Sequence, residues 1–131
     1  MQYHHVSIKT ADILRAIAFY EALGFTVEER FTAGITLGCW LSGAQTRLEL
    51  LQVPEPAPPP DSFGDEQYVG YYHLSFAVPN LQHTLAHLAQ TLGQVKILLR
   101  PRKQQIGDRT YQVCFLADPD GLPVELLELL N

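Results

Sequence analysis

The stretch Asp118-Pro119-Asp120-Gly121-Leu122-Pro123-Val124-Glu125-Leu126-Leu127 decides the fold of this chain. Its first four residues predict a tight turn, because Pro119 presets φ and Gly121 permits a positive φ. The apolar residues that follow predict a mostly buried strand. Glu125 stands within that strand, where a carboxylate loses hydration at a cost of several kcal/mol unless a cation or a proton compensates. Either Glu125 points to solvent from an edge strand, or the rest of the chain supplies it with a partner.

Length and composition bound the class of protein. The chain has 131 residues, of which 47% are hydrophobic, which is enough for one domain with a real core. A net charge of −5 argues against nucleic-acid and acidic-membrane partners, both of which need a basic surface. The sequence contains neither a membrane-length apolar run nor a secretory signal, which predicts a cytoplasmic protein. Cys39 and Cys114 are expected to be reduced and buried, although a disulfide between them is left open.

The two halves of the sequence predict the same succession of elements. Tyr72-His73-Leu74-Ser75-Phe76 echoes His4-His5-Val6-Ser7-Ile8, and each segment is followed by a helical pattern and then by three strand patterns. Expected in the first half are a strand at Tyr3–Lys9, a helix at Ile13–Leu23, and strands at Phe25–Phe31, Ile35–Leu41 and Thr46–Val53. Expected in the second half are a strand at Tyr72–Phe76, a helix at Leu81–Leu92, and strands at Val95–Arg100, Thr110–Leu116 and Leu122–Leu130.

This repeat predicts a single domain made of two βαβββ modules, residues 1–53 and 70–131. Residues 54–69 lie between the modules. They begin with five of the nine prolines, which cannot extend a sheet interior or a helix. We interpret them as a connector, or as a lid over a site.

Four candidate ligands fall at matching places in the two modules. His5 and His73 lie in the first strand of each module, and Glu49 and Glu125 lie in the last. Taken alone, each His is more often a hydrogen-bonded core residue, and each Glu more often faces solvent. Together, two imidazoles and two carboxylates among apolar neighbours predict a divalent-metal site for Ni, Zn, Co, Mn or Fe(II).

Other histidines and aromatic residues suit structural roles better. His83 and His87 have the i, i+4 spacing of a zinc site, but they lie off the apolar stripe of the second helix, which favours a solvated face. Strand alternation places His4 on the face opposite His5, and Trp40 is interpreted as a core residue.

Two further features have competing interpretations. Arg100-Pro101-Arg102-Lys103 is a positive patch on an acidic chain, either a solubilising loop or a clamp for a substrate carboxylate. Ser7 and Ser75 lack the context of a Ser–His–Asp triad, so nucleophilic catalysis is not predicted.

These motifs resemble those of the vicinal oxygen chelate superfamily, which includes glyoxalase I, methylmalonyl-CoA epimerase, extradiol dioxygenases and the bleomycin or fosfomycin resistance proteins. The resemblance implies an α+β fold in which paired βαβββ modules form a cupped, barrel-like mixed sheet around one metal. In many small members, the two halves of the site come from different subunits of a homodimer. The residues that carry the resemblance are His5-Val6-Ser7-Ile8, Phe19-Tyr20-Glu21-Ala22-Leu23-Gly24-Phe25, Glu49, His73-Leu74-Ser75-Phe76-Ala77-Val78, and Asp118-Pro119-Asp120-Gly121 with Glu125.

Within the superfamily, the His-Glu-His-Glu set is most similar to glyoxalase I. The epimerases usually carry Gln where Glu49 stands, and the dioxygenase and fosfomycin classes use two His and one Glu. The chain departs from bacterial glyoxalase I at Lys9, where Arg is usual, and at Val53, where an Asn for glutathione is usual. The chain can therefore share the metal chemistry of glyoxalase I while acting on a different substrate.

The resemblance thus implies a metal-dependent lyase or isomerase of glyoxalase I type, with Ni or Zn favoured over Fe, Mn or Co. Its substrate would be a small molecule with vicinal oxygens, such as the thiol hemithioacetal of a 2-oxoaldehyde, and Glu125 or Glu49 would be the base. The alternatives are another metalloenzyme of the scaffold (an extradiol dioxygenase, a thiol transferase or an epimerase) or a non-catalytic, drug-binding protein. Candidate substrate anchors are Lys9, Arg30, Arg102, Lys103 and Arg109.

Overall fold

Each half of the chain folds into a four-stranded mixed sheet with one helix, which confirms the predicted α+β class. The computed structural model describes residues 1–131, and these form two compact units, Met1–Pro58 and Pro59–Asn131. The first unit contains β1 (Val6–Thr10), α1 (Ile13–Ala22), β2 (Thr26–Ala33), β3 (Thr36–Gly43) and β4 (Thr46–Gln52). The second contains β5 (Leu74–Ala77), α2 (Leu81–Leu92), β6 (Ile97–Ile106), β7 (Arg109–Ala117) and β8 (Pro123–Leu129).

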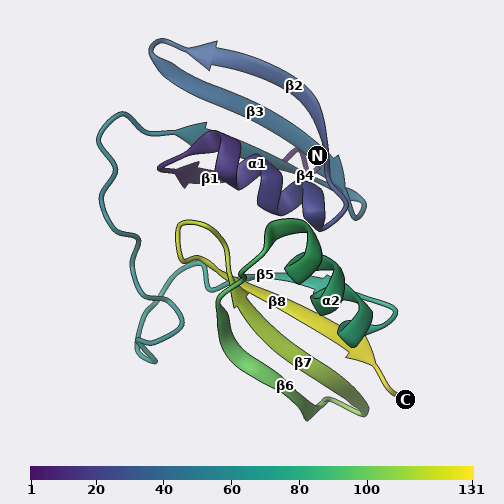
Figure 1. Cartoon of the computed structure of the whole chain (residues 1–131). Coiled ribbons are helices and arrows are strands. Elements are labelled where there is room, and N and C mark those ends of the chain that lie inside the picture. Colours follow the sequence, from purple (N-terminus) through teal and green to yellow (C-terminus); the bar gives the residue numbers. More distant parts are fainter. The chain divides into compact units, whose positions relative to one another are not determined.

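The first sheet has the strand order β1-β4-β3-β2, in which β1 runs parallel to β4 and the other pairs are antiparallel. Helix α1 packs over one face of this sheet (Figure 1). Its apolar stripe, which includes Ile17 and Tyr20, is buried, as are Leu48 and Leu50 of β4. Because side chains alternate along a strand, Glu49 between those two leucines points to the other face.

The second sheet repeats this plan with the order β5-β8-β7-β6. Val124 and Leu126 of β8 are fully buried, and α2 buries Leu81 and Leu88. Neither sheet closes on itself, so each has two edge strands. The histidine-bearing segments lead directly into the edge strands β1 and β5, each of which pairs with the strand that carries a candidate glutamate.

Both helices begin at the predicted residues, Ile13 and Leu81, and each has an N-cap residue and a second cap from the sheet. Asp12 and Asn80 accept hydrogen bonds from backbone N–H groups of the first turns. In addition, Gln52 Oε1 accepts from the first N–H of α1 at 2.9 Å, and Glu128 Oε2 accepts from the first N–H of α2 at 3.0 Å. These two residues each lie three positions after a candidate glutamate, so the repeat includes the caps as well as the candidate ligands.

The turn before β8 forms as predicted. Asp118 Oδ1 accepts hydrogen bonds from the N–H groups of Asp120 and Leu122, both at 2.9 Å, and Gly121 has a φ of 92°. Strand β8 then lies inside the sheet, between β5 and β7. Glu125 is 9% exposed, which rules out the edge-strand interpretation of this residue.

Two local predictions were wrong. The basic segment at residues 100–103 is part of β6 and not a loop, because an edge strand with a register shift between Leu99 and Arg102 can accommodate Pro101. The turn between β3 and β4 lies at Ala44 and Gln45, both with positive φ, two residues later than the Ser42-Gly43 turn that the glycine suggested.

Both cysteines are free and buried, as predicted. They also occupy equivalent positions in the repeat, because Cys39 pairs with Leu50 and Cys114 pairs with Leu126. Burial raises the pKa of both thiols, that of Cys114 to about 11.

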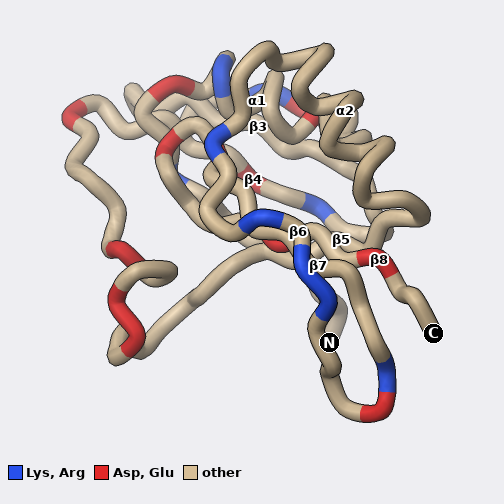
Figure 2. The backbone as a smooth tube through the Cα atoms, turned by 60° about the horizontal axis from the view of Figure 1, so that its bottom comes forward, with Lys and Arg blue, Asp and Glu red and all other residues tan.

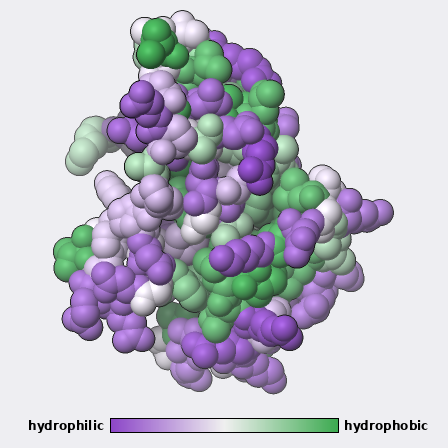
Figure 3. Space-filling view, turned by 60° about the vertical axis from the view of Figure 1, so that its left-hand side comes forward, coloured by the Kyte–Doolittle hydropathy of each residue, from purple (hydrophilic) through white to green (hydrophobic).

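Charged residues are unevenly distributed along the chain. The connector contains acidic residues and no basic ones, whereas basic residues lie along β6 (Figure 2). Hydrophobic atoms also reach the surface over a broad area (Figure 3), and Ile35, Val69 and Tyr71 are among the most exposed large apolar side chains. None of the helices has the length and apolar character needed to cross a membrane.

Candidate functional site

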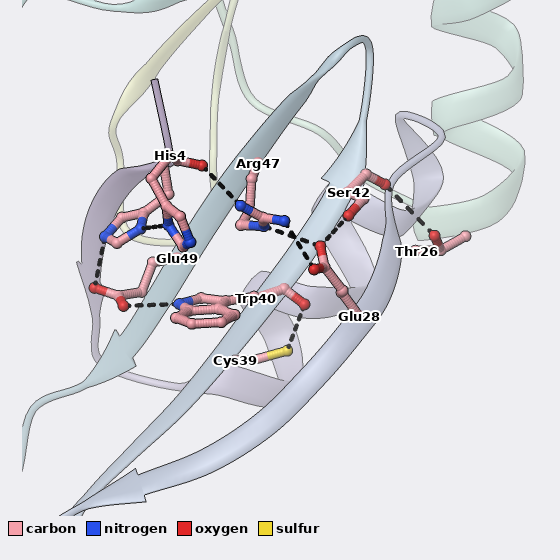
Figure 4. Close-up of polar contacts among 9 residues, drawn as sticks. His4, Thr26, Glu28, Cys39, Trp40, Ser42, Arg47 and Glu49 are labelled. Atoms are coloured by element: carbon pink, nitrogen blue, oxygen red, sulfur yellow. Dashed lines mark hydrogen bonds and ion pairs between the residues drawn. The ribbon is translucent and has the colours of Figure 1, made fainter. Parts of the chain in front are cut away.

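The first candidate half-site consists of His5, Ser7, Trp40 and Glu49. Figure 4 shows the contact between Trp40 and Glu49. Ser7 on β1 and Trp40 on β3 are the register partners of Glu49 on β4, so pairing of the three strands brings the side chains together. Glu49 Oε1 accepts a hydrogen bond from Ser7 Oγ at 2.7 Å, and Oε2 accepts one from Trp40 Nε1 at 2.9 Å. His5 Nε2 lies 3.5 Å from Glu49 Oε1.

These donors favour the ionised form of Glu49. Burial alone raises the pKa of this carboxyl, but the hydrogen bonds from Trp40 and Ser7 and the nearby rings of His5 and His4 outweigh it. The pKa of Glu49 therefore lies below its usual value. A carboxylate held as an anion beside an imidazole is prepared to bind a cation.

His4 lies beside His5, so its predicted position on the opposite face was wrong. The Nδ1 atoms of His4 and His5 are 2.7 Å apart, and the His4 ring meets Trp40 edge-on with centroids 5.1 Å apart. The alternation rule failed because β1 begins only at Val6, so His4 and His5 do not have strand geometry. His4 thus supplies the second ring nitrogen of His5 with a hydrogen-bond partner.

The second candidate half-site repeats the His–Ser–Glu trio with His73, Ser75 and Glu125. Ser75 Oγ donates to Glu125 Oε1 at 2.6 Å, and His73 Nε2 lies 3.4 Å from the same oxygen. The Nδ1 atom of His73 is buried without any hydrogen-bond partner. A buried ring nitrogen without a partner is unusual, and it distinguishes His73 from His5, whose Nδ1 has His4 as a partner.

Aromatic rings surround this second trio. Phe115 is the register partner of Glu125, which is the place that Trp40 has opposite Glu49. The Phe115 ring meets His73 edge-on at 4.9 Å, and Tyr72 meets His73 at 4.3 Å. Phe63 of the connector also packs on Phe115, at 5.3 Å. The second half-site is therefore more apolar than the first.

The geometry of each pair fits two neighbouring ligands of one metal ion. Nitrogen and carboxylate ligands bind zinc at about 2.0–2.2 Å, so ligands at tetrahedral or right angles lie about 3.0–3.4 Å apart. The observed nitrogen–oxygen separations of 3.5 and 3.4 Å are close to that range and longer than a good hydrogen bond. Neither unit by itself has three His, Cys, Asp or Glu side chains placed to hold a metal ion, so each unit offers a pair of ligands.

Strand register sorts the candidate substrate anchors by face. Lys9 follows Ser7 by two residues, Arg109 precedes Phe115 by six, and Arg102 pairs with Val113, which precedes Phe115 by two. These three anchors therefore lie on the half-site faces. Arg109 lies next to the β6–β7 turn, six residues from Phe115 or about 20 Å along the strand.

The two other candidate anchors lie on the opposite faces. Arg30 pairs with Cys39 and Lys103 pairs with Gln112, so their side chains point away from the glutamates. His83 and His87 are exposed on α2, as expected for a solvated face.

Sequence reasoning missed the partners of the two glutamates. Trp40 was interpreted as core, and Ser7 and Ser75 were considered only as nucleophiles, whereas all three donate to a carboxylate. One signal was available, because each serine follows its histidine by two residues in both modules.

Comparison with known sequences decides the family. A sequence model of the Glyoxalase/Bleomycin resistance protein/Dioxygenase superfamily matches residues 2–126. The chain belongs to this superfamily. As a member, it shares a scaffold that serves several different chemistries, so the family alone does not define the reaction.

Relatives within the superfamily align over nearly their whole length. The chain is 31% identical to YaeR of Escherichia coli strain K12, an uncharacterised protein, over 97% of this chain and 95% of that one. It is 32% identical to YwkD of Bacillus subtilis strain 168, also uncharacterised, over 95% and 94% of the two chains. Among solved structures, a glyoxalase family protein from Enterococcus faecalis is 27% identical with a TM-score of 0.76, over 97% of each chain.

Proposed function

We propose that the protein is a metal-dependent lyase or isomerase of glyoxalase I type. One observation carries the proposal: two repeat-related His–Glu pairs, His5 with Glu49 and His73 with Glu125, each have the spacing of neighbouring metal ligands. All four side chains would hold one divalent ion, with Ni or Zn favoured. The superfamily to which the chain belongs supports this assignment.

The ion would supply Lewis-acid stabilisation of the negative charge that develops on substrate oxygen when a neighbouring C–H loses its proton. The protein must then provide a base. Glu125 receives one side-chain hydrogen bond, from Ser75, whereas Glu49 receives two. Because hydrogen bonds to a carboxylate stabilise its anion, Glu49 suits the role of the more permanent ligand, and we assign the role of base to Glu125. Glu125 would take the proton from one carbon and return it to the next.

The substrate would be a small molecule with two vicinal oxygens, such as the hemithioacetal of a 2-oxoaldehyde. Arg102 and Lys9 are the best-placed anchors, because they lie on the half-site faces of their sheets. Val53 in place of the usual Asn argues for a thiol other than glutathione. A homodimer is part of the proposal, and the exposed apolar side chains such as Tyr71 and Val69 support it.

The aromatic surroundings of His73 favour a second candidate. Phe115, Tyr72 and Phe63 form a surface suited to a planar ring. With His5, His73 and Glu125 as ligands of Fe(II), the same scaffold would support extradiol cleavage of a catechol. Consumption of oxygen with a catechol, and no activity with a hemithioacetal, would establish this second function in place of the first.

Elemental analysis of the purified protein tests the metal proposal first. We expect near-stoichiometric metal in the wild type and in His83→Ala, whose histidine is exposed on α2, and loss of metal in His5→Ala and Glu125→Ala. A hemithioacetal assay follows with the loaded protein. Wild-type protein that takes up no metal after supply of Ni, Zn and Fe(II) would falsify the proposal.

A further inference from the structure

The segment that contains His5 lies outside the first sheet. Strand β1 begins at Val6, so the ladder with β4 does not reach His4 or His5. Backbone outside a strand ladder lacks the hydrogen bonds that hold a strand in place. A candidate metal ligand at this position needs another contact to hold its backbone.

Arg47 provides that contact. Its Nη1 donates to the carbonyl oxygen of His4 at 3.2 Å, directly before His5 (Figure 4). The guanidinium is itself fixed, because Nε and Nη2 donate to the two oxygens of Glu28 at 3.0 and 2.9 Å. Ser42 also donates to Glu28, and the guanidinium carbon lies 5.6 Å from the centre of the Trp40 ring.

A second contact of the same kind precedes the other histidine. Ser62 Oγ donates to the carbonyl oxygen of Tyr72 at 2.9 Å, directly before His73, and β5 begins only at Leu74. Ser62 comes from the connector, so this contact was not produced by the repeat. The position equivalent to Arg47 on β8 is Pro123, which pairs with Ala117 as Arg47 pairs with Ser42 and cannot donate.

We propose that Arg47 and Ser62 are positioning residues for the two histidines. Each donates to the carbonyl that precedes a histidine, and each thereby fixes a backbone segment that no strand ladder holds. The inference rests on the proposed function, because it assumes that His5 and His73 bind the metal.

The energetics favour a local role over a general stabilising one. Arg47 and Glu28 are each about one-third exposed, and exposed ion pairs contribute little to global stability. Residues that orient metal ligands, in contrast, typically change metal affinity 10–100-fold when replaced. Replacing Arg47 should therefore affect the order and affinity of His5 far more than the unfolding temperature.

The test compares Arg47→Met, Ser62→Ala and the control Arg15→Met, which removes an exposed arginine of α1. Competition titration with Zn measures affinity, and backbone ¹⁵N relaxation of the metal-free protein measures order. We expect about a tenfold loss of affinity for Arg47→Met, with raised mobility confined to residues 1–5. Ser62→Ala should raise the mobility of Tyr72 and His73 instead, and R47K, whose ammonium can still donate to the His4 carbonyl, should recover part of the affinity.

If Arg47→Met binds metal with wild-type affinity while His5→Ala loses the metal, the positioning role is overturned and the proposed function stays intact. Wild-type affinity in His5→Ala would overturn the metal site and the positioning role together. A loss of affinity in Arg15→Met equal to that in Arg47→Met would also overturn it, since the effect would then follow from charge alone.

Discussion

The two half-sites contain the same His–Ser–Glu trio in different surroundings. Glu49 receives hydrogen bonds from Ser7 and Trp40, and its histidine contacts a second imidazole, that of His4. In the other trio Phe115 replaces Trp40 and Tyr72 replaces His4, so Glu125 keeps a single donor and His73 Nδ1 has none. Backbone register brings each trio together, and the neighbouring side chains decide how many hydrogen bonds its carboxylate receives.

We infer from this difference that the two half-sites of the duplicated fold have different roles. The polar half-site suits a carboxylate that stays ionised and bound, and the aromatic half-site suits one that accepts and returns a proton. Variants made in matched pairs can test this division, because every position in one trio has a counterpart in the other.

The largest difference is expected between Glu125→Gln and Glu49→Gln. A positioned general base contributes about 100- to 10,000-fold to a rate, so Glu125→Gln should lower kcat of hemithioacetal isomerisation by at least about 100-fold. Glu49→Gln should retain measurable turnover, because the amide oxygen can still serve as a ligand. Steady-state kinetics on metal-loaded proteins measures both. Equal losses in the two variants would mean that the half-sites share the proton transfer.

The serine pair should differ in stability. Ser75→Ala removes the one side-chain donor of a buried carboxylate and should lower the free energy of unfolding by about 2 kcal/mol. Ser7→Ala leaves the Trp40 donor in place and should cost about 1 kcal/mol. Urea unfolding of the metal-free variants, followed by circular dichroism, gives the two values. A larger loss of unfolding free energy in Ser7→Ala than in Ser75→Ala would contradict the description of Glu49 as the carboxylate with more hydrogen-bond donors.

The connections before β4 and β8 can be compared next. Gln45 adopts a φ of 61° although it has a side chain, whereas Gly121 takes the positive φ of the other turn. Gly121→Ala should destabilise by about 1–2 kcal/mol, and Gln45→Gly should stabilise by up to about 1 kcal/mol. No heavy atom lies within 4 Å of a Cβ built on Gly121, so its substitution tests backbone strain without a steric clash. A shift of the thermal unfolding temperature in the same direction in both variants would contradict this account.

The smallest effect concerns the ion pair that only the first unit has. Hydrogen bonds from Arg47 and then Ser42 lower the pKa of Glu28 to about 2, from 4.5. A carboxyl with a depressed pKa contributes stability above its unfolded pKa, and that contribution is lost as the pH falls towards about 2. The stability difference between wild type and Glu28→Gln should therefore be full at pH 6 and shrink between pH 4.5 and 2. A difference that is constant with pH, measured by urea unfolding with Trp40 fluorescence, would contradict the assigned pKa.

Much of the fold followed from the sequence because it depends on local chemistry. Alternation and helical spacing predicted the two βαβββ successions, including helix starts at Ile13 and Leu81, and Gly121 predicted the turn before β8. The basic segment of β6 was misassigned because Pro101 signals a loop unless a register shift removes it from the ladder, and such a shift depends on the partner strand.

The sequence by itself determined which residues are candidates for chemistry, since His5, Glu49, His73 and Glu125 stand at repeat-related positions. Only the tertiary structure decided what holds them. Trp40 meets Glu49 through the register of β3 with β4, and Arg47 reaches His4 from a strand far along the chain. The physical reason is that periodicity along a chain reports which face a side chain occupies, whereas its hydrogen-bond partners depend on strand register and on segments outside the strands, which long-range packing sets.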